Sequence, residues 1–494
     1  MSSSISPFLL ISVVIAYFFL LMAISYFTSK GSDSQSFFTA NKKSPWFLVS
    51  FGMIGATLSG VTLISIPGVV GAGGLNQSYS YMQVVLGYMV GYLVIATVLM
   101  PIYYRLNLTT IYGYFEERFG TNSHKVGAAY FILSRIIGAS FRLFLVAIVL
   151  QKFVMDAFGI PFFLTVFMTI LLIWIYTYRG GIKTIVWTDT IQTFCMLLAV
   201  VLTIIAIGQE LGVGISGIPN LVLESDYTQM FYFDGGWSDP NNFYKQFFGG
   251  ALIAIVMTGM DQDMMQKNLT CKSLGEAQKN MFTFSVILIF ANILFLSLGI
   301  LLYLYAAQVG LDIPAKTDQL YPTIALTYLS PVIGVAFIIG LIAAAYSSAD
   351  SALTSLTTSF CVDFLGFNKK SIPEVEKKST RLKVHIGFSI VLLVVIIVFK
   401  SLNNDAIINQ LFTISGYTYG PILGLFMFGL FTKRGINDKL VIPICLAAPI
   451  VTYIINTNSA SWFGGFQFGF LMYALSGIIT FLGLSLISNR LKTN

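Results

Sequence analysis

The chain has 494 residues, of which 56% are hydrophobic and only 10% are charged. Soluble domains carry about 25% charged residues, so this composition excludes a soluble globular protein and predicts a membrane protein. A formal charge of +7 would by itself allow a nucleic-acid-binding protein, but the distribution of that charge along the chain gives it a different meaning.

Long apolar runs follow one another from one end of the chain to the other. A helix needs about 20 residues to cross the hydrocarbon core of a bilayer. The first run has no signal-peptide cleavage site, so we expect it to be retained. We predict an all-α polytopic membrane protein with about thirteen transmembrane helices, near residues 7–28, 46–70, 80–106, 123–156, 160–178, 186–208, 244–266, 279–308, 329–362, 383–399, 406–432, 438–457 and 467–489.

The loops between these spans differ in charge. The long 209–243 loop is acidic, and we interpret the 364–382 loop as a solvated run of charges. Most of the 28 Lys and Arg residues fall in alternate loops, and the opposite loops keep Lys152, Lys245, Lys316 and Lys400. Because basic loops stay inside, we expect an inner (plasma) membrane protein with its N-terminus outside and its C-terminus in the cytoplasm. The basic charge therefore reflects topology, and no nucleic-acid partner is expected.

Two of the predicted spans are interrupted, in corresponding positions of two halves of the chain. Paired broken helices are typical of transporters built from inverted repeats, whose binding site lies at the unwound segments. Glycine is also common in membrane helices for close packing, and this pattern alone leaves both interpretations open. The interruptions are Gly52, Gly55, Gly60 and Pro67 in the second span, and Gly249, Gly250 and Gly259 in the seventh.

Few charged residues lie inside the spans, and each is a functional hypothesis because a charge in lipid is costly. They are Arg135, Arg142, Asp189, Asp261, Asp263 and Asp350. Asp261 and Asp263 lie near a span end, where solvation or pairing with Lys267 is an equally good explanation. The four cysteines form no CxxC pair, so free thiols are expected.

The ninth span carries an unusual polar face. Ala344, Ser347, Ser348 and Ser351 follow i, i+3, i+4 and i+7, so they share one side of a helix. Such hydroxyls often bond back to the preceding turn of their own helix. Beside the free carbonyls of a broken helix, however, they form a set of oxygen ligands that suits a small alkali cation. Asp350 would add a negative charge nearby.

Four segments resemble the sodium:solute symporter family: GGIKTIVWTDTIQ (180–192), DQDMMQKNLTCKSLGEAQKNM (261–281), AAAYSSADSAL (343–353) and GYTYGPILGLFMFGLFTKRG (416–435). The resemblance covers essentially the whole chain, with the spans in the same order. It implies a LeuT-like fold of five plus five helices in an inverted repeat, within a single transporter domain over 1–494. The extra N-terminal helix would be 7–28, the repeats 46–208 and 244–432, and the two C-terminal helices 438–489.

The resemblance also implies where sodium binds. The main sodium site would use the backbone carbonyls of Gly55, Leu58 and Ala344 and the hydroxyls of Ser347 and Ser348. The family usually has alanine in place of Gly55, a change that keeps the carbonyl. A second, tentative site would use Asp189, Ser347, Asp350 and Ser351. Relatives more often have a hydroxyl where this chain has Asp350, so sodium occupancy and proton coupling both stay open there.

The resemblance to the sialic-acid members of the family suggests a substrate pocket. Its residues would be Thr57, Ser59, Thr62, Tyr79, Gln83 and Arg142, with Tyr79 in place of the usual phenylalanine. A guanidinium suits a carboxylate because two parallel N–H donors match its two oxygens. The alternative is that Arg142 pairs with an internal aspartate and touches no substrate.

Together these features predict a sodium-coupled symporter that imports a small organic solute by alternating access, most simply a carboxylated sugar such as sialic acid. A neutral sugar, a monocarboxylate or another small anion is the nearest alternative, and an ion channel is a more distant one. An enzyme has little support, because the sequence offers no catalytic histidine, metal-ligand set or nucleophile elbow. We expect no cofactor besides the coupling sodium ions, a lipid environment, and function as a monomer.

Overall fold

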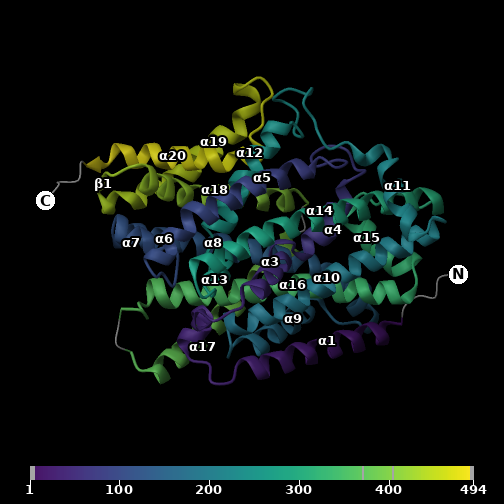
Figure 1. Cartoon of the computed structure of the whole chain (residues 1–494), viewed down its shortest axis with the longest axis horizontal. Coiled ribbons are helices and arrows are strands. Elements are labelled where there is room, and N and C mark those ends of the chain that lie inside the picture. The colour runs from purple at the N-terminus through teal and green to yellow at the C-terminus, as the bar shows by residue number, and fades with distance from the viewer. Residues whose placement is uncertain (1–5, 370–371, 403–404, 490–494) are drawn as a thin grey trace.

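The computed structural model describes residues 6–369, 372–402 and 405–489 (Figure 1). Ten helices are long and apolar enough to cross a membrane, two bent pairs each make a further span, and the shorter apolar helix α9 completes the series. The prediction of an all-α protein with about thirteen spanning helices is confirmed. The spans are α1 (Pro7–Thr28), α3 (Trp46–Thr57) with α4 (Gly60–Val69), α5 (Tyr81–Val94) with α6 (Met100–Arg105), α8 (Thr121–Leu150), α9 (Phe162–Thr177), α10 (Ile182–Glu210), α12 (Phe243–Ala254) and η7 (Ile255–Gly259) with α13 (Gln262–Asn268), α14 (Leu274–Val309), α16 (Pro331–Ser359), α17 (Glu374–Leu402), α18 (Asp405–Phe431), α19 (Val441–Trp462) and α20 (Met472–Leu486).

Short elements occupy the loops. The helices α2 (Ser34–Thr39), α7 (Gly113–Arg118), α11 (Ile218–Leu223) and α15 (Leu320–Thr323) connect the spans, and β1 (Gly435–Ile436) pairs with β2 (Ser488–Asn489) in antiparallel register. The 209–243 loop is therefore partly ordered into helix by α11.

The second half of the 364–382 loop is helical, because α17 begins at Glu374, and residues 373–376 are exposed, as the interpretation of a solvated run of charges expects. Acidic residues in a first helical turn favour the helix through its dipole. The Glu374 carboxylate also accepts a hydrogen bond from the Ser34 N–H at 2.7 Å. In addition, the Arg381 guanidinium lies over the Phe37 ring, 4.3 Å from its centroid. This part of the loop is thus held against α2.

The central helices are buried and the outer ones face lipid. Figure 1 shows α3, α10 and α16 in the middle of the molecule, with α1 along one edge and α19 and α20 along the opposite edge. In the most apolar stretch of α16 78% of residues are buried, against 22% in α1 and in α19. Small residues allow membrane helices to approach closely. At Gly340 of α16, for example, a β-carbon would lie only 2.7 Å from the Ala199 Cβ of α10.

The predicted interruptions of the second and seventh spans are confirmed. The axes of α3 and α4 differ by 58° and those of the α12–η7 helix and α13 by 69°. The first break lies at Leu58 and Ser59, and the second at Met260 and Asp261, directly after Gly259. Gly250 serves packing instead: it lies inside α12, and a β-carbon there would meet the Val84 carbonyl oxygen at 2.2 Å.

Candidate functional site

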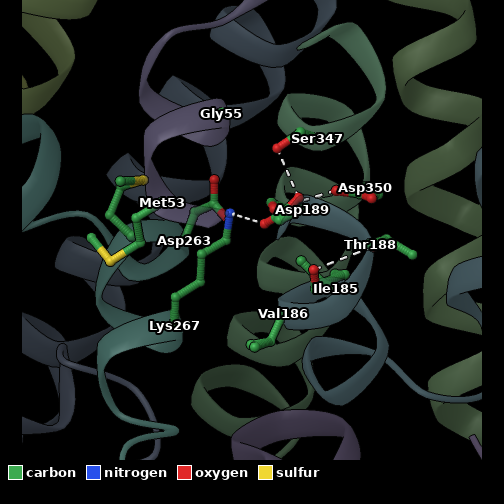
Figure 2. Close-up of polar contacts among 12 residues, drawn as sticks. Met53, Gly55, Ile185, Val186, Thr188, Asp189, Asp263, Lys267, Ser347 and Asp350 are labelled. Carbon is green, nitrogen blue, oxygen red and sulfur yellow. Dashed lines mark hydrogen bonds and ion pairs between the residues drawn. The ribbon is translucent and has the colours of Figure 1, made fainter. Parts of the chain in front are cut away.

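The first helix break faces the polar side of α16. A β-carbon at Gly55 would lie 3.4 Å from the Ser347 Oγ, and one at Gly60 would lie 3.6 Å from the Ala345 backbone nitrogen. Figure 2 shows Gly55 beside Ser347. The fold therefore brings the two halves of the predicted main sodium site to the same place.

Several oxygens at this break have no hydrogen-bond partner. The Ser348 Oγ is buried and unpaired. Among the hydrogen bonds of the described residues, none is accepted by the carbonyl of Gly55 or Leu58, because the last carbonyls of a helix lose their intrahelical donors. Ala344 lies in the uninterrupted helix α16, and a carbonyl there keeps a second lone pair. Buried oxygens left open in this way fit a small alkali cation.

Thr193 explains why glycine stands at position 55. The Gly55 N–H donates to the Thr193 Oγ1 at 3.0 Å, and a β-carbon at Gly55 would approach the same oxygen to 2.3 Å. The threonine hydroxyl thus fills the space that an alanine methyl group would need.

The side chains of the tentative second site form one buried cluster between α10 and α16, which we call the second cluster: Asp189, Ser347, Asp350 and Ser351. The Ser347 hydroxyl donates to Asp189 Oδ1 at 2.7 Å. Asp350 Oδ2 accepts from the Tyr176 hydroxyl at 2.7 Å, and Asp350 Oδ1 accepts from Ser351 at 3.3 Å. Asp189 and Asp350 are both fully buried.

Lys267 completes this cluster. Its Nζ lies 2.6 Å from Asp189 Oδ2, and the lysine side chain is 2% exposed (Figure 2). The hypothesis that Lys267 pairs with Asp261 or Asp263 is therefore wrong. Lys267 extends away from its own helix, α13, and meets a carboxylate on α10.

Arg135 of α8, and not Lys267, neutralises the aspartates at the second break. Its guanidinium pairs with Asp263 and, at 3.3 Å, with Asp261 Oδ1. Asp261 also caps α13 by accepting from the N–H groups of Asp263 and Met264, and it accepts a hydrogen bond from the Tyr419 hydroxyl. Protein groups thus neutralise the carboxylates at this break, although Asp263 Oδ1 and Arg135 Nε are buried without a hydrogen-bond partner.

Arg142 lies on α8 near the first break. Val146, one turn further on, contacts the position of Gly60 at this break. Arg142 is half-buried, and within the described residues no ion pair or hydrogen bond involves it. The alternative hypothesis is that Arg142 pairs with an internal aspartate. In the structure Arg135 forms that pair, and Arg142 does not.

The other predicted pocket residues divide into two groups. Near the first break, the Thr57 Oγ1 is buried without a partner, Ser59 is buried, and Thr62 is half-buried.

Tyr79 and Gln83 are bound to other parts of the protein. The Tyr79 hydroxyl pairs with Ser297 at 2.7 Å. The Gln83 amide donates to the Asn241 carbonyl at 2.9 Å and accepts from the Tyr232 N–H at 3.1 Å. A role of these two residues in substrate contact stays a prediction.

Comparison with known proteins places the chain in a family. The sequence profile of the sodium:solute symporter family matches residues 37–439. The chain belongs to this family. The resemblance seen in the sequence is confirmed, and this symporter is a membrane protein that couples solute movement to sodium.

Its relatives include two bacterial proteins of similar length. The symporter is 24% identical to the sodium/sialic acid symporter NanT of Aliivibrio fischeri, over 94% of this chain and 91% of NanT. It is 26% identical to the sodium/sialic acid symporter SiaT of Proteus mirabilis, over 93% and 92%. A substrate-bound, outward-open Na+-coupled sialic acid symporter superimposes with a TM-score of 0.81 at 23% identity, covering 98% and 99% of the two chains, which supports the LeuT-like fold.

For three residues of this symporter's site, the sequence does not predict the contacts that the structure shows. Thr193, Tyr176 and Arg135 touch Gly55, Asp350 and the second break, respectively. Arg135 stands out in the sequence as a charge inside a span, but its partners depend on how α8 packs. Tyr176 and Thr193 resemble any other residues of an apolar helix, and no sequence signal distinguishes them.

The Gly55–Thr193 contact predicts a rescue. Replacing Gly55 by alanine forces a methyl group into the Thr193 hydroxyl and should destabilise the protein by about 1–3 kcal/mol, as overpacking does. The double variant Gly55→Ala/Thr193→Ala should recover most of this loss, because the obstructing oxygen is gone. Thermal unfolding in detergent measures both, with Thr193→Ala alone as the control. Equal unfolding temperatures of Gly55→Ala and wild type would contradict the packing argument.

Proposed function

We propose that this symporter imports sialic acid, or a closely similar carboxylated sugar, together with sodium bound at the main site of Gly55, Leu58, Ala344, Ser347 and Ser348. The observation that carries the sodium site is the set of unpaired buried oxygens where the first helix break meets α16. Polar atoms buried without partners are costly. A sodium ion would satisfy several of them together.

Sodium at this site would hold the broken span α3–α4 against α16. A conformational state with that contact intact would bind both sodium and substrate more tightly than a state in which the contact is open. By linkage, sodium and substrate then strengthen each other's binding. Release of sodium into a compartment of low sodium concentration would separate α3–α4 from α16 and free the substrate.

Arg142 supports a carboxylated substrate. It is a half-buried guanidinium, one turn from the Val146 side chain that packs at the first break, and it forms no ion pair in the described residues. A guanidinium partly withdrawn from water gains from a bound anion, so a substrate carboxylate would supply the missing partner. The hydroxyls of Thr57, Ser59 and Thr62 lie beside the first break and would contact the hydroxyl groups of a sugar. The names of the relatives NanT and SiaT point to the same substrate.

The same proposal includes the organisation of the chain: a first repeat over 46–208, a second over 244–432, and a monomer surrounded by lipid in the plasma or inner membrane. The loop charges favour an N-terminus outside and a C-terminus in the cytoplasm.

A reporter fusion tests this orientation. A reporter enzyme that works only in the cytoplasm should be active when fused after residue 494. A reporter active only outside the cytoplasm, fused at the same position, is the control, and activity of that reporter alone would reverse the topology.

Ser348→Ala tests the main sodium site. The Ser348 hydroxyl would contribute one ligand to the ion, and loss of a hydrogen-bond-strength contact to a charge is worth about 1.5–3 kcal/mol. The half-saturating sodium concentration should therefore rise about 10- to 100-fold. Thermal stabilisation by sodium in detergent, with potassium replacing sodium at constant ionic strength, measures it. Ser355→Ala is the matched control, because the Ser355 hydroxyl only bonds to Ala352 of its own helix. An unchanged sodium response in Ser348→Ala would exclude this site.

Arg142→Gln tests the substrate. The wild-type protein should bind sialic acid about 10- to 100-fold more tightly than its neutral methyl ester, because only the acid gives the guanidinium a charged partner. The variant should bind acid and ester equally. Arg142→Lys keeps the charge without the fork and should retain a reduced preference. Competition binding in sodium measures these ratios, and stronger wild-type binding of a neutral hexose would replace sialic acid as the substrate.

A further inference from the structure

In the main site oxygens stand open, whereas in the second cluster every carboxylate oxygen has a donor or a cation. Ser347 donates to Asp189 Oδ1, and Lys267 contacts Asp189 Oδ2. Tyr176 and Ser351 donate to the two oxygens of Asp350. A sodium ion entering this cluster would therefore have to displace Lys267 from Asp189. The two sites share Ser347, but in the second cluster the Lys267 ammonium already stands where a cation would bind.

We propose that the Lys267 ammonium is a tethered cation that replaces a second sodium ion at Asp189, so that this symporter binds one sodium ion per transport cycle. This inference rests on the proposed function, because it concerns the number of ions that accompany the substrate. A lysine ammonium is a compact positive charge, so it can neutralise a buried carboxylate much as a metal ion would. Unlike sodium, it is never released to the other side of the membrane.

The structure holds Lys267 in this position through contacts of the residues directly before and after it. Before it, Gln266 donates to the Phe38 carbonyl at 2.7 Å and to Thr358 Oγ1 at 2.9 Å. After it, Asn268 accepts from the Asn280 amide at 2.6 Å. The lysine is 2% exposed, so it does not reach water as a snorkelling lysine does. Neighbouring contacts thus direct its ammonium at Asp189.

Removing Lys267 should open the second cluster to sodium. A carboxylate buried without its partner is strongly unfavourable, and the hydroxyls of Ser347 and Ser351 beside Asp189 and Asp350 are the oxygen ligands that a small cation would use. The apolar variant Lys267→Met keeps the length of the side chain and removes the charge. In this variant a sodium ion would take the place that the ammonium leaves.

Equilibrium binding of radiolabelled sodium to the purified full-length protein, without substrate, counts the ions directly. We expect one sodium ion per wild-type protein and two per Lys267→Met protein. The double variant Lys267→Met/Asp189→Asn should again bind one sodium ion, because it lacks the Asp189 carboxylate that the additional ion needs. Lys267→Arg keeps a cation at Asp189 and should bind one. The additional ion in Lys267→Met should persist in Lys267→Met/Ser348→Ala, since Ser348 belongs to the main site only.

Each outcome separates the inference from the proposed function. Two sodium ions on the wild-type protein, with one lost in Ser348→Ala, would overturn the tethered cation while leaving sodium symport intact. A single ion on both wild type and folded Lys267→Met would also overturn it. No sodium bound to wild type would contradict the main sodium site, and the inference with it. If Lys267→Met does not fold, Lys267→Gln removes the same charge with a polar side chain and takes its place in the count, with two ions expected and one ion overturning the inference.

Discussion

Hydrocarbon offers no hydrogen bonds, so a break in a membrane helix survives only where protein or a bound ligand satisfies the freed backbone groups. The two breaks of this symporter differ in whether protein groups satisfy the polar atoms there. At Met260–Asp261, the Asp261 carboxylate caps α13, and Arg135 and Tyr419 hold that carboxylate in turn. At Leu58–Ser59, backbone carbonyls and the Ser348 hydroxyl are left without partners. At the second break a protein cation already neutralises the carboxylates, and the first break is the natural place for an ion.

The same contrast distinguishes the two arginines of α8. Arg135 and Arg142 are two turns apart and project from the same side of the helix. Arg135 forms ion pairs with Asp261 and Asp263. Arg142 has no acidic partner in the described part of the chain. A guanidinium in this situation favours an anion that can arrive and leave. Arg135 thus has a structural task, and its pairing keeps Arg142 available for a carboxylate.

Sequence could predict what depends on periodicity, and it could not predict what depends on lateral packing. The length of the apolar runs predicts the spans. Glycine and proline predict which spans are interrupted, but not where: Pro67 lies inside α4, and the breaks fall at Leu58–Ser59 and Met260–Asp261. The shared face of Ser347, Ser348 and Ser351 follows from 3.6 residues per turn. The partners of Lys267 and Arg135 do not follow from any local pattern, because Asp189 lies on another helix and α8 reaches the second break only after the bundle is packed. The hypothesis that Lys267 pairs with Asp261 or Asp263 fails for the same reason, because the fold supplies each of these groups with a partner from another helix.

Ser347 joins the proposed sodium site to the rest of the core. Its hydroxyl gives its hydrogen to Asp189, so the oxygen lone pairs remain for an ion at the main site. Asp189 in turn holds Lys267 on α13, and the N-cap of α13 is Asp261, which pairs with Arg135 of α8, two turns from Arg142. A continuous series of contacts therefore runs from the sodium ligands, through one buried carboxylate, to the helix that borders the proposed substrate site. Because the first and second broken helices meet α16 and α10 through these same groups, a shift of α13 would change the orientation of Asp189 and Ser347. Such a shift would alter the sodium site without any direct contact between ion and substrate.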